Sequence, residues 1–119
     1  MALKKAGLAR VRREIRDAID RGVETAAGYV ADLASQLAPY DETANHKHLN
    51  ESIEVRGDKG SRKRKVVAGV GLPDARAIYN EYGTEYMAAA PYMGPAAEAI
   101  DVGQEVKAEI QKLIKGSRP

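Results

Sequence analysis

Residues 78–97, IYNEYGTEYMAAAPYMGPAA, carry the most information about the fold of this 119-residue chain. Ala75, Ile78, Tyr79 and Tyr82 place apolar side chains at helical spacing, and Gly83 follows them as a stop that readily adopts the left-handed αL conformation of a helix end. Residues 84–90 are extended in character and predict a third strand. Pro95 then predicts a new helix, because proline suits the first helical turn. The stretch therefore predicts a helix, an extended segment and a second helix in close succession.

Tyrosine is concentrated in this stretch, which holds four of the six tyrosines of a chain without Phe, Trp or Cys. The stretch contains no nucleophile–base pair, metal-ligand cluster or phosphate-binding loop. We interpret it as a segment that places aromatic side chains against another surface, since tyrosine is enriched at interfaces. The candidate contacts with other subunits or partners are Glu81, Tyr82, Tyr86, Tyr92 and Met93. Packing in or at the edge of the core is the alternative for the tyrosines and the methionine.

Upstream of this stretch, apolar residues recur every 3.6 positions and predict one long amphipathic helix. They are Leu8, Val11, Ile15, Ile19, Val23, Ala26, Val30, Leu33 and Leu37. Gly22 and Gly28 each weaken the helix by about 1 kcal/mol relative to alanine, and they allow a bend or a close approach. Pro39 ends the helix, because the residue before a proline is driven out of helical geometry.

Residues 52–56 and 62–71 alternate polar and apolar side chains around the turn-forming residues 57–61, which predicts a β-hairpin. A stripe from Ala96 to Leu113 predicts a second long helix, with Pro91 and Pro95 fixing the approach to it. The predicted fold class is therefore α+β: long N-terminal and C-terminal helices packed on a small antiparallel sheet, with a hairpin and a short middle helix. We expect one domain over residues 1–119, with residues 1–7 and 116–119 as frayed tails.

Composition narrows the function. The absence of cysteine excludes disulfides and thiolate metal sites, and no apolar run reaches the ~20 residues of a membrane span. We expect a soluble intracellular protein without catalytic residues, cofactor or metal. The net charge of +2 conceals a local excess, because residues 56–65 contain six basic residues and one acidic residue.

The basic cluster at Arg62, Lys63, Arg64 and Lys65 has two interpretations. The hairpin tip could present its charge to DNA, whose phosphates attract cations without sequence preference. Alternatively, these residues keep an exposed sheet edge soluble and prevent strand pairing, which is the interpretation we favour from sequence.

Glu81 has a carboxylate in the last turn of its predicted helix, where it opposes the helix dipole. The residue four positions earlier is Ala77, so no neighbour on the helix supplies a cation. We predict an ion pair with an arginine of another element or another subunit. The alternative is a solvated glutamate at a frayed helix end.

The chain resembles a family of small tailed-phage proteins, the head–tail joining or tail-completion proteins of siphophages and prophages. The resemblance rests on residues 78–84, IYNEYGT, followed by residues 90–96, APYMGPA, with tyrosine at two positions where the family often has phenylalanine. Residues 38–41, APYD, with His48-Leu49 and Ser52-Ile53, resemble a second landmark, although its glycine is missing.

The resemblance implies structural work and no enzyme activity. Such proteins are thought to form a ring, commonly six-fold, between the portal connector and the tail tube, with double-stranded DNA passing through it. The implied partners are copies of the chain itself, connector or neck proteins and the tail-tube protein. The implied location is the virion neck or tail, and the host cytoplasm during assembly.

Other functions stay open at this point. One is a head-closure or minor capsid protein on a similar scaffold. Another is a non-specific double-stranded DNA-binding module, which predicts duplex binding that weakens steeply with salt. The near balance of acidic and basic residues speaks against that module. A small enzyme is the most distant alternative.

Overall fold

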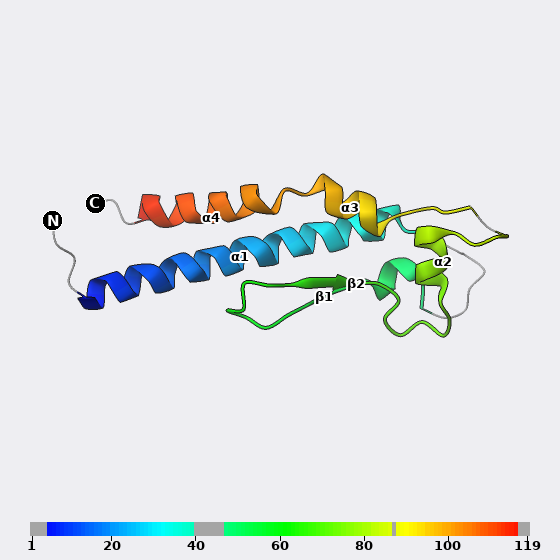
Figure 1. The fold of residues 1–119 in the computed structure, drawn as a ribbon, viewed down its shortest axis with the longest axis horizontal. Coiled ribbons are helices and arrows are strands. Elements are labelled where there is room, and N and C mark those ends of the chain that lie inside the picture. The colour runs from blue at the N-terminus through cyan, green and yellow to red at the C-terminus, as the bar shows by residue number, and fades with distance from the viewer. Residues whose placement is uncertain (1–4, 40–46, 87, 117–119) are drawn as a thin grey trace. The chain divides into compact units, whose positions relative to one another are not determined.

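A computed structural model describes residues 5–39, 47–86 and 88–116 of the chain (Figure 1). Its elements in order are α1 (Lys5–Leu37), a 3₁₀ helix (Leu49–Ser52), β1 (Glu54–Arg56), β2 (Lys65–Val67), α2 (Arg76–Tyr82), α3 (Met93–Ala99) and α4 (Val102–Gly116). The predicted α+β class is confirmed. Internal contacts divide the chain into a first unit, residues 1–26, 57–64 and 101–119, and a second unit, residues 27–56 and 65–100.

The long N-terminal helix predicted from the 3.6-residue repeat is confirmed as α1. It begins at Lys5, so residues 5–7, expected to fray, are already helical. It ends at Leu37, and the Ala38 N–H still reaches the Ala34 carbonyl at 2.9 Å. Pro39 stands two residues beyond the end, as the sequence predicts. At the other end of the chain, Gly116 is the last residue of α4, while residues 117–119 lie outside the described part.

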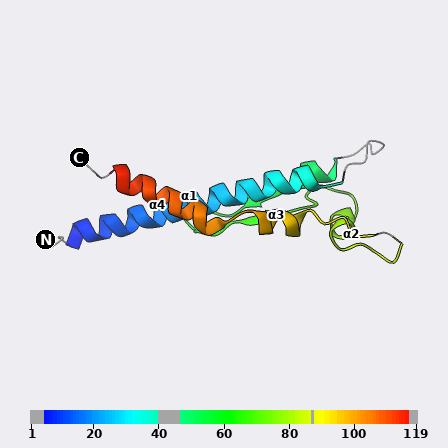
Figure 2. The ribbon, with the colours of Figure 1, turned by 90° about the horizontal axis from the view of Figure 1, so that it is seen from above.

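In the first unit, α4 lies beside the N-terminal part of α1 (Figures 1 and 2). The two helices approach closely at Gly22, where a Cβ atom would lie 2.5 Å from the Val106 Cα. An ion pair of 3.3 Å joins Arg21 to Glu109 at the same crossing. The absence of a side chain at Gly22 therefore allows α4 to approach α1 closely, which is one of the two roles predicted for this glycine. At Gly28, a Cβ would meet nothing within 4 Å.

The predicted β-hairpin is present in shorter form. β1 and β2 pair antiparallel, with Glu54 opposite Val67 and Arg56 opposite Lys65. Ser52 ties the hairpin to the 3₁₀ helix, because its fully buried hydroxyl accepts the Gly69 N–H at 3.0 Å and donates to the Leu49 carbonyl.

The core of the second unit is aliphatic apart from one ring, as composition predicts. Its buried residues are Ala34, Ala38, Leu49, Tyr92 and Ala96. Partly buried side chains from α1, α2, α3 and the segments that flank the hairpin pack against them: Val30, Leu33, Ile53, Ala68, Leu72, Ala77 and Met93. Small alanines on α1 and α3 let one tyrosine fill the space between helices.

Two predictions about the second half of the chain are wrong. Residues 84–86 and 88–90 do not form a third strand, and Met87 lies outside the described residues. Thr84 makes an isolated bridge, Glu85 and Tyr86 form a turn, and the sheet found among the described residues has two strands. The single C-terminal helix is divided, because Ile100 is extended, with φ −105° and ψ 123°. Asp101 starts α4 anew, since its carboxylate accepts the Gln104 N–H at 3.2 Å.

Within the three described ranges, none of the helices combines the length and apolar character needed to cross a membrane.

Candidate functional site

The candidate site is the segment from α2 to the start of α3, in the second unit. Asp74 stabilises the start of α2. Its carboxylate accepts the Arg76 N–H at 3.1 Å and forms an ion pair with the Arg76 guanidinium at 2.9 Å. Gly83 ends α2 with φ 76° and donates its N–H to the Tyr79 carbonyl at 2.7 Å. The predicted positive φ is confirmed. Its ψ of 178°, however, is extended and not left-handed helical, a combination that only glycine adopts readily.

Glu81 joins the end of α2 to the beginning of α3. Its carboxylate accepts three backbone N–H groups, from Tyr92 at 2.8 Å, Met93 at 3.0 Å and Gly94 at 2.8 Å. The carboxylate thus occupies the position of a helix cap, although it comes from another element. The positive end of the α3 dipole faces it, which offsets the unfavourable position of Glu81 at the end of α2.

The pKa of Glu81 follows from this geometry. Partial burial by itself raises the pKa, but the N–H donors of Tyr92, Gly94 and Met93 outweigh it and leave the pKa below its ordinary value. In the described part of the chain, the partners of the carboxylate are thus backbone N–H groups where we expected an arginine. An ion pair between Glu81 and another subunit stays a prediction.

Tyr92 and Met93 belong to the core. Tyr92 is 1% exposed, and its hydroxyl donates to the Ala77 carbonyl at 2.9 Å, which ties α3 to α2. Burial, with a smaller contribution from the Glu81 charge, raises the pKa of Tyr92 to about 12. Met93 packs partly buried against the same core. For these two residues the structure favours the core alternative.

Tyr82 and Tyr86 lie on the surface, with 79% and 91% of their area exposed. Ile78 and Tyr79 are exposed as well, and α2 has no buried residue. We call Ile78, Tyr79, Tyr82 and Tyr86 the aromatic surface. The helical spacing of α2 is therefore confirmed, but the large apolar side chains at that spacing are exposed. Asn80 holds the returning chain against α2, because its carbonyl accepts the Ala90 N–H at 2.7 Å.

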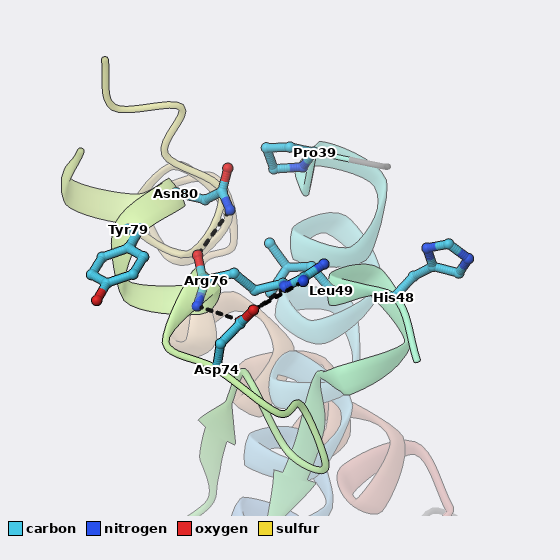
Figure 3. Close-up of a pocket in the computed structure, with 7 residues that line it drawn as sticks. All are labelled: Pro39, His48, Leu49, Asp74, Arg76, Tyr79 and Asn80. Atoms are coloured by element: carbon cyan, nitrogen blue, oxygen red, sulfur yellow. Dashed lines mark hydrogen bonds and ion pairs between the residues drawn. The ribbon is translucent and has the colours of Figure 1, made fainter. Parts of the chain in front are cut away.

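A pocket of about 340 Å³ opens beside α2, lined by Pro39, His48, Leu49, Asp74, Arg76, Tyr79 and Asn80 (Figure 3). Asp74 and Arg76 pair across its wall, and Asn80 donates to the Arg76 carbonyl at 2.8 Å. No group of three or more His, Asp or Glu side chains in the described ranges could hold a metal ion. His46, the other histidine of this region, lies outside those ranges.

The basic hairpin tip belongs to the first unit and is attached to α1 through Asp20. The Asp20 carboxylate accepts the backbone N–H groups of Gly60 at 2.9 Å and Arg62 at 2.8 Å, and both guanidinium nitrogens of Arg64 at 2.9 and 3.1 Å. Both side chains of the ion pair are buried, Arg64 at 3% exposure and Asp20 at 6%. Arg62 has a φ of 59°, which is uncommon outside glycine.

This contact changes which basic residues reach solvent. The Arg64 hydrogen bonds, followed by that of the Gly60 N–H, lower the pKa of Asp20 well below its ordinary range, although desolvation opposes them. The same ion pair raises the pKa of Arg64. Arg64, one of the candidate DNA-facing residues, therefore has its guanidinium turned inward. The side chains of Arg62, Lys63 and Lys65 are exposed, with Lys65 in the second unit.

Sequence reasoning missed the roles of Asp20 and Asp101. For Asp20 no local signal exists, because its partners lie about forty residues away in the hairpin tip. For Asp101 a signal was available: an aspartate followed three residues later by glutamine is a pattern of helix starts.

The chain was compared with known proteins. Residues 4–83 match the model of the HK97-gp10-like family, described as "Bacteriophage HK97-gp10, putative tail-component". The match includes α2 and ends at Gly83, so the α3 partners of Glu81 lie beyond it. No curated protein and no solved structure matches the chain. The match spans about two thirds of the sequence and agrees with the resemblance seen in residues 78–84: the chain belongs to the HK97-gp10-like family of bacteriophage tail components.

Proposed function

We propose that this chain is a structural subunit that forms a ring at the head–tail joint or tail end of a phage, as a tail-completion or tail-terminator protein. One observation carries the proposal: the aromatic surface is exposed in a member of a phage tail-component family. Ile78, Tyr79 and Tyr82 follow helical spacing on α2, and Tyr86 is exposed in the turn that comes after it. Such exposed patches are typical of surfaces that bind another protein.

The way α2 is held supports this role. Glu81 fixes the end of α2 to the start of α3 through three hydrogen bonds, and the Tyr92 hydroxyl binds the carbonyl of Ala77 in the first turn of α2. Tyr82 is therefore presented from a rigid element, which lowers the entropy lost when a partner binds. A subunit that offers different surfaces to its two neighbours generates a closed ring when the rotation between copies is suitable.

The remaining features of the proposal follow from the family resemblance. The ring is six-fold, its two faces contact a connector or neck protein and the tail-tube protein, and double-stranded DNA passes through the opening. The subunit is present in the host cytoplasm during assembly and in the neck or tail of the virion afterwards.

The test replaces the exposed aromatic side chains. The double variant Tyr82→Ser/Tyr86→Ser is introduced into the phage, and joined particles are counted by electron microscopy. We expect joined heads and tails to be lost while the purified variant keeps the wild-type Tm. Tyr29→Ser is the matched control, because Tyr29 is also exposed, at 48%, but belongs to α1 and is not part of the aromatic surface. Normal joining in the double variant would contradict the proposal.

A head-closure or minor capsid role on the same scaffold is the second candidate. Particles without the protein separate the two roles. Filled heads beside unattached tails support the tail-end role, whereas heads that lose their DNA support head closure.

A further inference from the structure

Charge is distributed unequally between the two units of the chain. The first unit contains fifteen of the nineteen basic residues and eight acidic residues, a net charge of +7. The second unit contains four basic and nine acidic residues, a net charge of −5. The near balance of the whole chain, which speaks against DNA contact, therefore does not describe the first unit. Its field attracts polyanions.

Within the first unit, one face of α1 carries three exposed arginines. Arg12, Arg13 and Arg16 line a shallow hollow together with Ala9. None of the three arginines forms an ion pair with any residue in the described ranges, whereas their neighbour Arg10 pairs with Glu14 at 3.2 Å. Arginine presents a planar fork of donors that matches phosphate oxygens and stays charged at any physiological pH.

The Asp20 contact brings the hairpin tip to this same face. An α-helix turns about 100° per residue, so Arg12, Arg13, Arg16 and Asp20 fall within an arc of about 100°. Asp20 is one turn beyond Arg16, about 6 Å along the axis. Because Asp20 binds the backbone N–H groups of Gly60 and Arg62, the tip is held about one helical turn from Arg16, and the side chains of Arg62 and Lys63 in this tip are exposed.

We propose that Arg12, Arg13, Arg16, Arg62 and Lys63 form one continuous basic face that contacts the phosphate backbone of duplex DNA. Asp20 acts as a positioning residue, since it joins two sequence segments into this surface and turns Arg64 away from it. The proposal deepens the proposed function by naming the surface that meets the passing DNA, but the contact itself is a property of the single chain.

The expected contact is weak and independent of DNA sequence. Phosphate contacts carry no sequence information, so a face that contacts only the phosphate backbone does not distinguish one DNA sequence from another. Asp17, at the border of the face, and the buried Asp20 both reduce its positive potential. A moderate attraction lets DNA slide past the surface, because exchange of counterions at equivalent phosphates costs little along the duplex.

The experiment measures binding of a fluorescein-labelled duplex to the purified chain by fluorescence anisotropy over a series of salt concentrations. The test variant is Arg12→Ala/Arg13→Ala/Arg16→Ala, in which alanine preserves helix propensity. If each arginine neutralises one phosphate, the slope of log K against log salt becomes shallower by about 2.7, at 0.9 per phosphate. Arg62→Ala/Lys63→Ala should make the same slope shallower by about 1.8. Circular dichroism verifies that both variants stay folded.

The matched control is Lys107→Ala/Lys112→Ala/Lys115→Ala, which removes the same number of charges from α4 in the same unit. We expect its slope to stay close to that of the wild type. An equal loss in the control would show that only net charge matters and would overturn the proposal, as would a wild-type slope in the α1 variant. Binding of poly-glutamate without binding of duplex at the same salt would assign the face to an acidic protein instead.

The two proposals can fail separately. The duplex assay uses the isolated chain and needs no ring, whereas the count of joined particles in the Tyr82→Ser/Tyr86→Ser phage needs no DNA affinity.

Discussion

Replacing Glu81 by glutamine tests the link between α2 and α3 most directly. One carboxylate oxygen accepts the N–H groups of Tyr92 and Met93, and the other accepts that of Gly94. Glutamine keeps one acceptor oxygen and places an NH₂ donor where the other stood, so at least one backbone N–H loses its acceptor and faces a donor. A hydrogen bond to a charged group contributes a net stability of about 1.5–3 kcal/mol. We therefore expect the variant to lose about 2 kcal/mol of unfolding free energy.

Thermal unfolding followed by circular dichroism measures this loss, which corresponds to a fall in Tm of roughly 5–10 °C for a domain of this size. Glu85→Gln is the matched control, because Glu85 is exposed in the turn three residues beyond the end of α2. Surface substitutions of that kind usually change the unfolding free energy by no more than about 0.5 kcal/mol. If Glu81→Gln changes Tm no more than Glu85→Gln does, the three hydrogen bonds do not hold α3 to α2.

The pH dependence supplies a second signature of the same contact. The folded-state pKa of Glu81 is lowered, so its contribution to stability is fully present above the ordinary glutamate pKa of about 4.3 and is lost as the pH falls below it. The Tm difference between wild type and Glu81→Gln should accordingly narrow in acid. A difference that stays constant from neutral to acid pH would mean that glutamine acts through packing and not through charge.

Three further predictions concern single side chains. Gly22→Ala should destabilise by about 1–3 kcal/mol through the clash with the Val106 backbone, whereas Gly28→Ala, with open space, should stabilise by up to about 1 kcal/mol; chemical denaturation compares their signs. The pKa of Tyr92 is raised to about 12, so its contribution to stability is present below the ordinary tyrosine pKa of about 10 and is lost as the pH rises through about 12. In an alkaline absorbance titration, Tyr92→Phe should therefore remove the last step of tyrosinate formation. Asp20→Asn should remove hydrogen-exchange protection from the amides of the hairpin tip at neutral pH, and the wild type should lose that protection only well below the ordinary aspartate pKa, because its folded-state pKa is lowered.

Local patterns in the sequence were sufficient to predict α1, the hairpin and the end of α2 at Gly83. The 3.6-residue repeat extends over nine apolar positions, and Pro39 supplies an end that no tertiary contact has to enforce. The alternation around residues 57–61 specifies a hairpin in the same local way. Gly83 was recognised because only glycine adopts its backbone conformation at low cost.

The break at Ile100 shows where periodicity misleads. The apolar stripe continues from α3 into α4 at helical spacing, yet Asp101 caps a new helix and Ile100 is extended. An apolar repeat reports only the positions of apolar residues. It therefore gives no sign of a polar side chain that competes for the backbone N–H groups.

The amino-acid sequence by itself determined α1, the hairpin and α2, the family and the concentration of tyrosines around α2. Only the tertiary structure decided which tyrosine is buried, which partner Glu81 takes and which arginine of the tip is withdrawn from solvent. The physical reason is distance along the chain: Tyr92 and Tyr86 have equally apolar rings, and Arg64 and Arg62 have identical charges. Tyr92 differs from Tyr86 because residues far away in sequence supply the cavity that its ring fills. Arg64 differs from Arg62 because the Asp20 carboxylate, also far away in sequence, binds its guanidinium. Such contacts form only when the chain has folded.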